Sequence, residues 1–241
     1  MYRAGILAGL VCLAASLVQA TPLCVAGSLE EYVALGAEGC SVGDVTFSNF
    51  QFSAIPLFTV APDAGAIRVN PDNTPILGNA LLGTGGSGLD FAYNRVLLPE
   101  PHPATQSFTL PSLSMAISYD VISPAGLDRA TFAPQLSADP LATSAMVVTI
   151  GSAICAYADA SQGVPGPSGC GLGGAGSAHV LQDVRLVTGA AFGAGAAIGS
   201  VATRWSEVSG DTSGAPEPET WMLLGLGLVL VAMGSRGVRR G

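Results

Sequence analysis

Hydrophobic and polar residues alternate along much of the chain after residue 45. Residues 114–121 show the pattern most clearly, because every second position is apolar and the positions between them are serine, alanine or aspartate. The apolar residues of this run are Met115, Ile117, Tyr119 and Val121. A period of two places such residues on one face, so we predict a half-buried antiparallel strand with these four side chains in the core.

Six further runs have the same period and predict further strands. They cover residues 45–52, 66–69, 89–93, 145–150, 180–187 and 201–208. The first of these runs is irregular near Asn49, because Phe47 and Phe50 lie three positions apart. Both phenylalanines can face the core only if a β-bulge inserts one extra residue between them.

One short helix is expected ahead of the strands. Ser28 and Glu31 have the spacing of a capping box, in which each side chain bonds the backbone N–H of the other residue. Gly36 then suits the left-handed position that ends a helix. The apolar residues that would share one face of this helix are Leu29, Tyr32 and Val33.

Clusters of turn-forming residues separate the predicted strands, at 71–73, 83–88, 99–103 and 124–126. Many short strands, such turns and one short helix indicate a mainly β fold, an antiparallel β-sandwich of jelly-roll type. Residues 163–176 are rich in glycine and proline and predict an exposed loop. Residues 189–199 are nearly all alanine and glycine, and the pattern leaves a weak helix, a loose strand and a loop open.

Charge excludes one class of partner. Residues 21–215 carry 15 acidic residues and five arginines, a formal charge of −10, and no stretch gathers basic residues. A protein that binds a phosphate backbone needs a basic surface, so we exclude nucleic acid as a partner.

The first 20 residues have the layout of a secretory signal peptide. Arg3 precedes an apolar run at residues 6–18, and Val18-Gln19-Ala20 forms a cleavage site. The run is too short for a membrane anchor. We therefore expect export across the inner membrane, with the Sec export machinery and signal peptidase as partners.

Cysteine usage agrees with export. Removal of Cys12 with the signal peptide leaves an even number of cysteines, which indicates disulfides in an exported protein. Three pairings are possible, and proximity in the sequence favours two loops of about 15 residues each. The favoured pairs are Cys24–Cys40 and Cys155–Cys170. A zinc site would need closely spaced cysteine pairs with histidine partners, and the spacing offers neither.

Motifs for catalysis and cofactor binding are weak. Residues 171–176 match G-x-G-x-x-G, but no predicted strand leads into them, so we expect no dinucleotide cofactor. We interpret His102, in a proline-rich loop, as a solvated residue, and His179, at the start of a strand, as a rim residue. Asp72 and its neighbouring asparagines fit solvated turn residues better than a calcium loop. We therefore expect a non-enzymatic protein without cofactor or metal.

The last 26 residues combine three features. The motif Pro216-Glu217-Pro218 precedes an apolar helix at residues 221–235, and a basic tail follows at residues 236–241. The arginines of the tail are Arg236, Arg239 and Arg240. The positive-inside rule places this tail in the cytoplasm. A helix of this length reaches roughly 22 Å, against a hydrocarbon core of about 30 Å, so the span is short for a permanent anchor.

This end of the chain resembles the PEP-CTERM sorting signal of Gram-negative bacteria, also catalogued as an ice-binding-protein C-terminal domain. Residues 216–218, the Gly-Leu-Gly-Leu run at 225–228 and the closing arginines carry the resemblance. Residues 39–44 and 47–50 also look like the start of many exported PEP-CTERM ectodomains. The resemblance implies recognition by exosortase, a membrane cysteine protease, and an association with exopolysaccharide and biofilm. It implies no activity for the ectodomain.

Three parts are therefore expected: a signal peptide (1–20), an exported β-rich ectodomain (21–215) and a sorting signal with a transmembrane helix (216–241). We expect a non-enzymatic surface or extracellular-matrix protein that is anchored in the membrane by its C-terminal helix, either transiently before release or permanently. The alternative is a secreted carbohydrate-binding or carbohydrate-active module, with extracellular polysaccharide as a partner. An ice binder would need a regular threonine array, and the threonines show no repeat.

Overall fold

The structure is a computed structural model, and it describes residues 21–72, 86–98, 100–102, 107–109, 111–163, 168–189 and 194–208. The expected signal peptide and the expected sorting segment, with its motif and basic tail, lie outside these residues. Asn73 and the side chain of His102 lie outside them as well. Within the described part of the chain, no helix is both long enough and apolar enough to cross a membrane.

Strands dominate the described residues. They are β1 (Gly27–Ser28), β2 (Cys40–Val42), β3 (Val45–Leu57), β4 (Arg68–Asp72), β5 (Gly88–Leu97), β6 (Glu100–His102), β7 (Ser107–Thr109), β8 (Ser112–Ala138), β9 (Thr143–Ile150), β10 (Ala153–Asp159), β11 (Ser168–Val187) and β12 (Ala196–Glu207). The helical elements are α1 (Leu29–Ala34) and two short 3-10 helices, η1 (Ala64–Ala66) and η2 (Ala160–Gln162). The runs predicted from alternation fall within these strands, except that only the second half of residues 66–69 lies in β4, Ala66 belongs to η1 and Val208 follows the end of β12.

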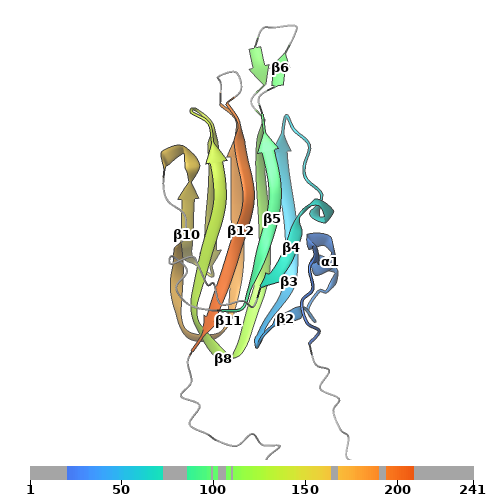
Figure 1. Cartoon of the computed structure of the whole chain (residues 1–241), viewed down its shortest axis with the longest axis vertical. Coiled ribbons are helices and arrows are strands. Elements are labelled where there is room, and N and C mark those ends of the chain that lie inside the picture. Colours follow the sequence, from blue (N-terminus) through green and yellow to red (C-terminus); the bar gives the residue numbers. More distant parts are fainter. Residues whose placement is uncertain are drawn as a thin grey trace, which may run out of the picture.

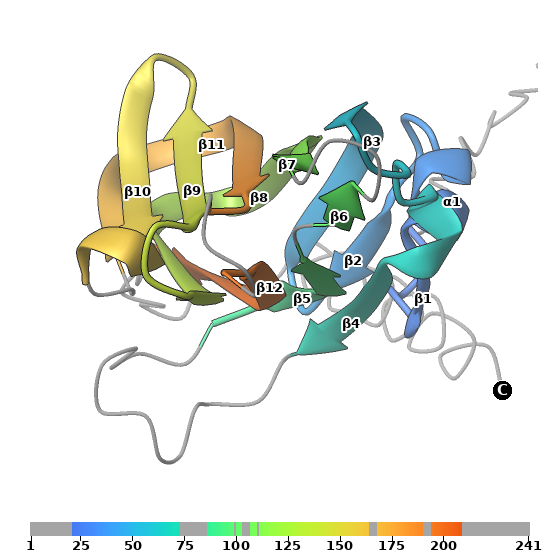
Figure 2. The ribbon, with the colours of Figure 1, turned by 90° about the horizontal axis from the view of Figure 1, so that it is seen from above.

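The strands pack as two layers, which Figure 2 shows from above. Layer A contains β2, β3, the first part of β8, the second part of β11, β9 and β10, in that order. Layer B contains β1, β4, β5, β12, the second part of β8 and the first part of β11. Neighbouring strands run antiparallel, so the expected mainly β, antiparallel sandwich is confirmed.

Two long strands belong to both layers. β8 pairs with β3 as far as Ile122 and with β12 from Leu127 onward, and β11 bends beside it. Gly126 has a φ of 84° at this bend, and a Cβ there would lie 2.8 Å from the carbonyl oxygen of Gly174. Both described ends of the chain leave the sandwich at the bend, where the N–H of Val208 donates to the carbonyl of Gly126 (Figure 1).

The bend corrects two expectations from the sequence. Residues 124–126 do not reverse the chain but lie inside β8, and residues 168–176 belong to β11 rather than to an exposed loop. Glycine and proline serve a bend in a strand as well as they serve a turn, because both structures need conformations that other residues adopt with strain.

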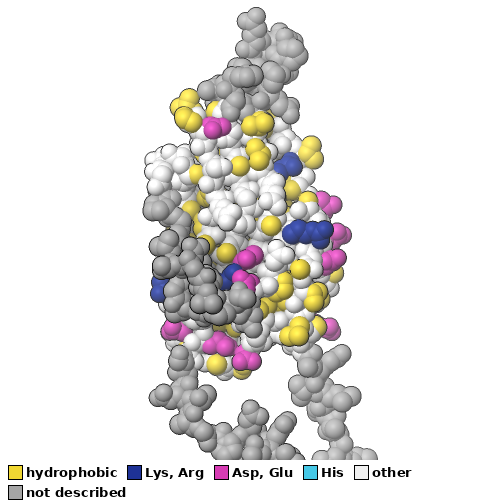
Figure 3. Space-filling view, in the orientation of Figure 1, with side chains coloured by type: hydrophobic (Ala, Val, Ile, Leu, Met, Phe, Trp, Pro, Cys, Tyr) yellow, Lys and Arg dark blue, Asp and Glu magenta, His cyan; other side chains and the backbone are white. Residues whose placement is uncertain are grey.

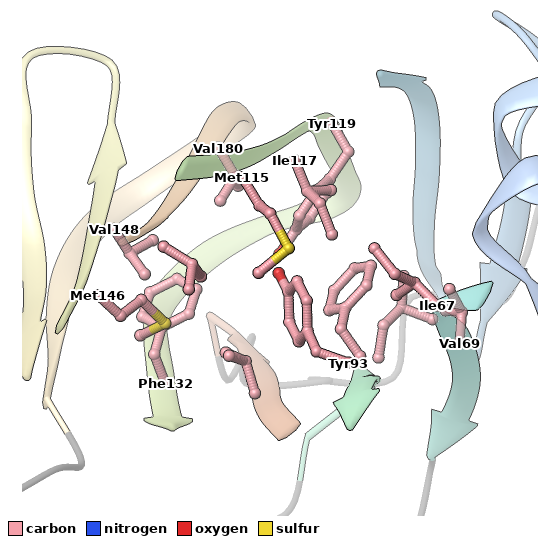
Figure 4. Close-up of a cluster of buried hydrophobic side chains, with 14 of the residues drawn as sticks. Ile67, Val69, Tyr93, Met115, Ile117, Tyr119, Phe132, Met146, Val148 and Val180 are labelled. Atoms are coloured by element: carbon pink, nitrogen blue, oxygen red, sulfur yellow. The ribbon is translucent and has the colours of Figure 1, made fainter. Parts of the chain in front are cut away.

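The core lies between the layers. The four side chains predicted to be buried in residues 114–121 are at most 1% exposed, which confirms the register of that strand. Figure 4 shows Met115, Ile117 and Tyr119 of β8 pointing across the core toward Tyr93 of β5. Gln182 of β11 is also fully buried there, and it donates to Tyr119 Oη at 3.0 Å and accepts from Tyr93 Oη at 3.4 Å.

The predicted β-bulge near Asn49 and the predicted short helix are both present in the structure. The pairing of β3 with β8 shifts between Ser48 and Gln51, and Asn49 adopts a φ of 54°, so Phe47 and Phe50 are both buried. The capping box of α1 is present, and Gly36 is left-handed as expected. The prediction for the helix face is wrong at one residue, because 38% of Val33 remains exposed.

Both predicted disulfides are present. Cys24–Cys40 ties the N-terminal segment to β2, and Cys155–Cys170 joins β10 of layer A to β11 where that strand lies in layer B. Two disulfides are typical of a protein in an extracellular or periplasmic compartment. The segment that the sequence left open is resolved in part, because residues 196–199 begin strand β12. β12 is the last strand of the described residues, and it lies between β5 and β8 in the middle of layer B.

Candidate functional site

The outer face of layer A is uneven, because its outward side chains differ in length from strand to strand. Side chains alternate between the core and solvent, and the outward positions of β8 and β9 hold short residues. These short residues are Ser112, Ser114, Ala116 and Ser118 on β8, and Thr143, Ala145, Val147 and Thr149 on β9. β11 lies between the two strands and presents the longer side chains of Leu181, Asp183 and Arg185, so it forms a ridge between two shallow troughs.

A groove of about 690 Å³ lies on this face, and we name it the outer groove. Its lining comes from four adjacent strands, β8, β11, β9 and β10. The lining residues are Ser112, Ser114, Thr143, Ala145, Val147, Tyr157, Asp159, Asp183, Arg185 and Val187. Hydroxyl groups, two carboxylates, one guanidinium and one aromatic ring therefore surround a single open space.

Tyr157 and Asp159 form one wall of the outer groove. Tyr157 Oη donates to Asp159 Oδ2 at 3.1 Å, and Asp159 Oδ1 accepts from the backbone N–H of Ser161 at 2.9 Å and from its hydroxyl at 2.6 Å. The hydrogen bonds from Ser161 favour the ionised carboxyl and hold the pKa of Asp159 below its usual value. These contacts fix the orientation of the tyrosine side chain, which is 46% exposed at the edge of the groove.

Asp183 and Arg185 project into the groove from β11. Two residues along an antiparallel strand span about 6.8 Å, and short residues flank both side chains on the neighbouring strands. Within the described residues, neither side chain forms an ion pair or a hydrogen bond. Their donors and acceptors are therefore available to a ligand.

A second polar cluster lies on the same face, closer to the bend. His179 Nδ1 is 2.7 Å from Asp120 Oδ1, and Asn49 Nδ2 donates to Asp120 Oδ2 at 2.7 Å. Partial burial acts to raise the pKa of Asp120, but the hydrogen bonds from His179 and Asn49 outweigh burial and lower it. The side chain of His179 is 59% exposed, but the residue lies inside β11 rather than at the start of a strand as expected.

Asp72 and the G-x-G-x-x-G match, both weighed above as possible ligand sites, instead have structural roles. Asp72 was expected to be a solvated turn residue, but it ends β4 and pairs with Arg204 at 2.6 Å. Arg204 also pairs with Asp90 at 2.7 Å. The match to G-x-G-x-x-G lies inside β11, and the strand simply continues after it, so no helix N-terminus is present to hold a pyrophosphate.

Neither a cluster of metal ligands nor a basic patch stands out in the part of the chain that the structure describes. Within the described ranges, no group of three or more histidine, cysteine, aspartate or glutamate residues is placed to hold a metal ion. On the face seen in Figure 3, the basic side chains lie apart from one another rather than in one patch.

The residues of the outer groove were not identified from the sequence. Asp183 and Arg185 fall at outward positions of a predicted strand, which is the one signal that marks them as exposed. Tyr157 and Asp159 lie on β10, which was not predicted. In β10 the pairing shifts at Cys155, and that bulge interrupts the alternation. The order of the strands, which brings the four residues together, has no local signal.

No known protein family and no curated protein matches the sequence. Among solved structures, the chain is similar to TmCBM61, determined in complex with beta-1,4-galactotriose, at 15% identity and a TM-score of 0.28. That match covers 65% of this chain and 88% of the other. The chain is also similar to the GH31 alpha-xylosidase of Xanthomonas citri, at 7% identity and a TM-score of 0.21, over 68% of this chain and 25% of the other. Similarity this low carries no argument about function.

Proposed function

We propose that this protein is an exported, non-enzymatic surface or matrix protein whose β-sandwich binds extracellular polysaccharide in the outer groove. The observation that carries the proposal is the make-up of that groove. An exposed tyrosine ring, several hydroxyls and two charged side chains without protein partners line one open surface. A sugar ring has an apolar face that packs on an aromatic ring, and hydroxyls that both donate and accept hydrogen bonds.

The shape of the groove supports a chain-like ligand. The troughs run along the strands, and the lining residues span several positions on β8, β9 and β11. An open groove of this kind accommodates a polymer that continues beyond it in both directions. A closed pocket would instead accept only a small molecule or a chain end.

Two carboxylates in the groove raise glycoside hydrolysis as a second candidate. A glycosidase needs one carboxyl group that stays protonated near neutral pH, which requires a raised pKa. The pKa of Asp159 is instead lowered by its bonds from Ser161, so this carboxyl is unsuited to act as the general acid. Asp159 is therefore better suited to accept hydrogen bonds from a bound ligand than to protonate a leaving group.

Delivery to the cell surface is proposed from the sequence. Residues 1–20 would direct export, and the motif at 216–218 with its apolar helix would hold the chain until exosortase acts on it. Both described ends of the chain leave the sandwich at the bend. The outer groove instead lies near η2 and the first residue of β8, at the end of layer A away from the bend. An anchor at the C-terminus would thus leave the groove free to meet polysaccharide.

Binding can be tested with the full-length protein in mild detergent and the extracellular polysaccharide of its host. Tyr157→Ala and Asp183→Asn are each expected to weaken retention in affinity electrophoresis roughly tenfold, the equivalent of one lost charged hydrogen bond or stacked ring. Asp128→Asn is the matched control, because it removes another exposed carboxylate, on β8 beside the bend and outside the outer groove. Equal retention of all variants would refute the groove as the site, and release of reducing ends would favour the hydrolase.

A further inference from the structure

We propose that the outer groove selects an uncharged glycan and discriminates against polysaccharides built from uronic acids. This inference rests on the proposed function and adds the chemical class of the ligand. It follows from the charges that line the groove and from those of the whole domain.

The lining of the outer groove carries a net negative charge. Asp159 and Asp183 contribute two carboxylates, and Arg185 contributes the one guanidinium of the lining. The bonds from Ser161 keep Asp159 ionised, so its charge persists well below neutral pH. A carboxylate on the ligand would therefore meet two like charges for each opposite one.

Arg185 does not create a separate anion site. Asp183 is two positions away on the same face of β11, with the two Cα atoms about 6.8 Å apart, so a carboxylate held by Arg185 would lie near a second carboxylate. Repulsion at that distance offsets much of the attraction to the guanidinium. A neutral hydroxyl avoids this conflict, because it can accept from Arg185 and donate to Asp183 at the same time.

The net charge of the whole domain also disfavours the binding of an acidic glycan. Residues 21–215 carry a formal charge of −10, and no cluster of basic residues interrupts it in the sequence. A polyuronate carries one negative charge per sugar, so it is repelled as it approaches such a domain, most strongly at low ionic strength. A neutral glycan experiences no such repulsion, and its affinity should not depend on salt.

The test compares matched ligands on the full-length protein. Oligosaccharides of glucose, mannose and galactose are each paired with the oligosaccharide of the corresponding uronic acid, with the same length and linkage. Affinities are measured by isothermal titration calorimetry in low salt and in about 1 M NaCl, where the Debye length falls to about 3 Å.

At least one neutral oligosaccharide is expected to bind. The affinity of its uronic acid counterpart should be at least tenfold lower in low salt, and the two affinities should become more similar in high salt. Asp183→Asn should weaken the neutral ligand and strengthen the acidic one, which narrows the difference between them. Arg129→Ala, an exposed arginine beside the bend, is the control for Arg185→Ala and should change neither affinity.

Tighter binding of a uronic acid ligand in low salt, with loss of that binding in Arg185→Ala, would overturn the inference and leave the proposed function intact. Absence of binding in every pair would overturn the proposed function together with the inference. The two failures are therefore distinguishable in one set of titrations.

Discussion

Replacement of Gln182 by leucine tests whether a polar contact between the layers stabilises the sandwich. Gln182 bridges Tyr119 of layer A and Tyr93 of layer B, and within the described residues it is the hydrogen-bond partner of the Tyr93 hydroxyl. Burial raises the pKa of both tyrosines, so both hydroxyls stay protonated at neutral pH. Leucine has a volume close to that of glutamine but offers no polar atom to either hydroxyl.

The expected loss can be worked out from these contacts. A buried hydroxyl left without a partner costs about 1–3 kcal/mol, and a lost neutral hydrogen bond costs about 1 kcal/mol. Tyr93 falls in the first class because its O–H donor loses its acceptor, whereas Tyr119 falls in the second because it loses one bond accepted from a neutral amide. Gln182→Leu should therefore lower the free energy of unfolding by about 2–4 kcal/mol.

Urea unfolding followed by circular dichroism and tryptophan fluorescence would measure this loss, since Trp205 is buried against Phe132. The control is the same substitution in a Tyr93→Phe/Tyr119→Phe background, which has no hydroxyl to leave unsatisfied. There the loss should fall below about 1 kcal/mol. An equal loss in both backgrounds would show that shape rather than hydrogen bonding is responsible, and would refute the reasoning.

Three further predictions concern charge, crosslinking and the tail. The pKa of Asp120 is lower in the folded state than in the unfolded state. The stability that Asp120 contributes is therefore complete above its unfolded-state pKa of about 3.9, and it is lost as pH falls through its folded-state pKa. Asp120→Asn should therefore flatten the acid limb of a stability-against-pH curve, and an unchanged limb would contradict this. Cys155→Ser with Cys170→Ser should lower unfolding stability by about 3 kcal/mol, whereas the same midpoint in urea for variant and wild type would contradict the loss. Alanine at residues 216–218 should leave the precursor in the membrane of a host with exosortase, and equal release on an immunoblot would reduce the motif to a spacer.

Local patterns were sufficient to predict most of the strands but not their arrangement. The alternation at residues 114–121 and the slip at Asn49 are properties of neighbouring residues, and both have the expected result in the structure. The bend was missed because Gly126 and the glycines of β11 resemble turn residues when each segment is considered separately. Only the pairing of two strands far apart in the sequence shows that both bend at the same place.

The outer groove depends still more on long-range pairing. β9 lies between β10 and β11, which places Val147 opposite both Tyr157 and Asp183. No property of residues 153–159 or 180–187 by themselves indicates that these strands share a neighbour. The charges of Asp183 and Arg185 also resemble those of any solvated strand, because what distinguishes them is the absence of a partner among the described residues.

The position of β12 has a consequence for the order in which the protein can fold. Among its described strands, layer B has the one synthesised last, β12, in the middle. The edges of β5 and β8 that pair with β12 therefore stay open until residues 196–207 are present. Such non-local pairing is slow, because loop closure precedes any gain from contacts. A chain still emerging from the ribosome, or one truncated before β12, would expose two unpaired strand edges that are prone to aggregate. Completion of the sandwich thus waits for nearly the whole of the described domain.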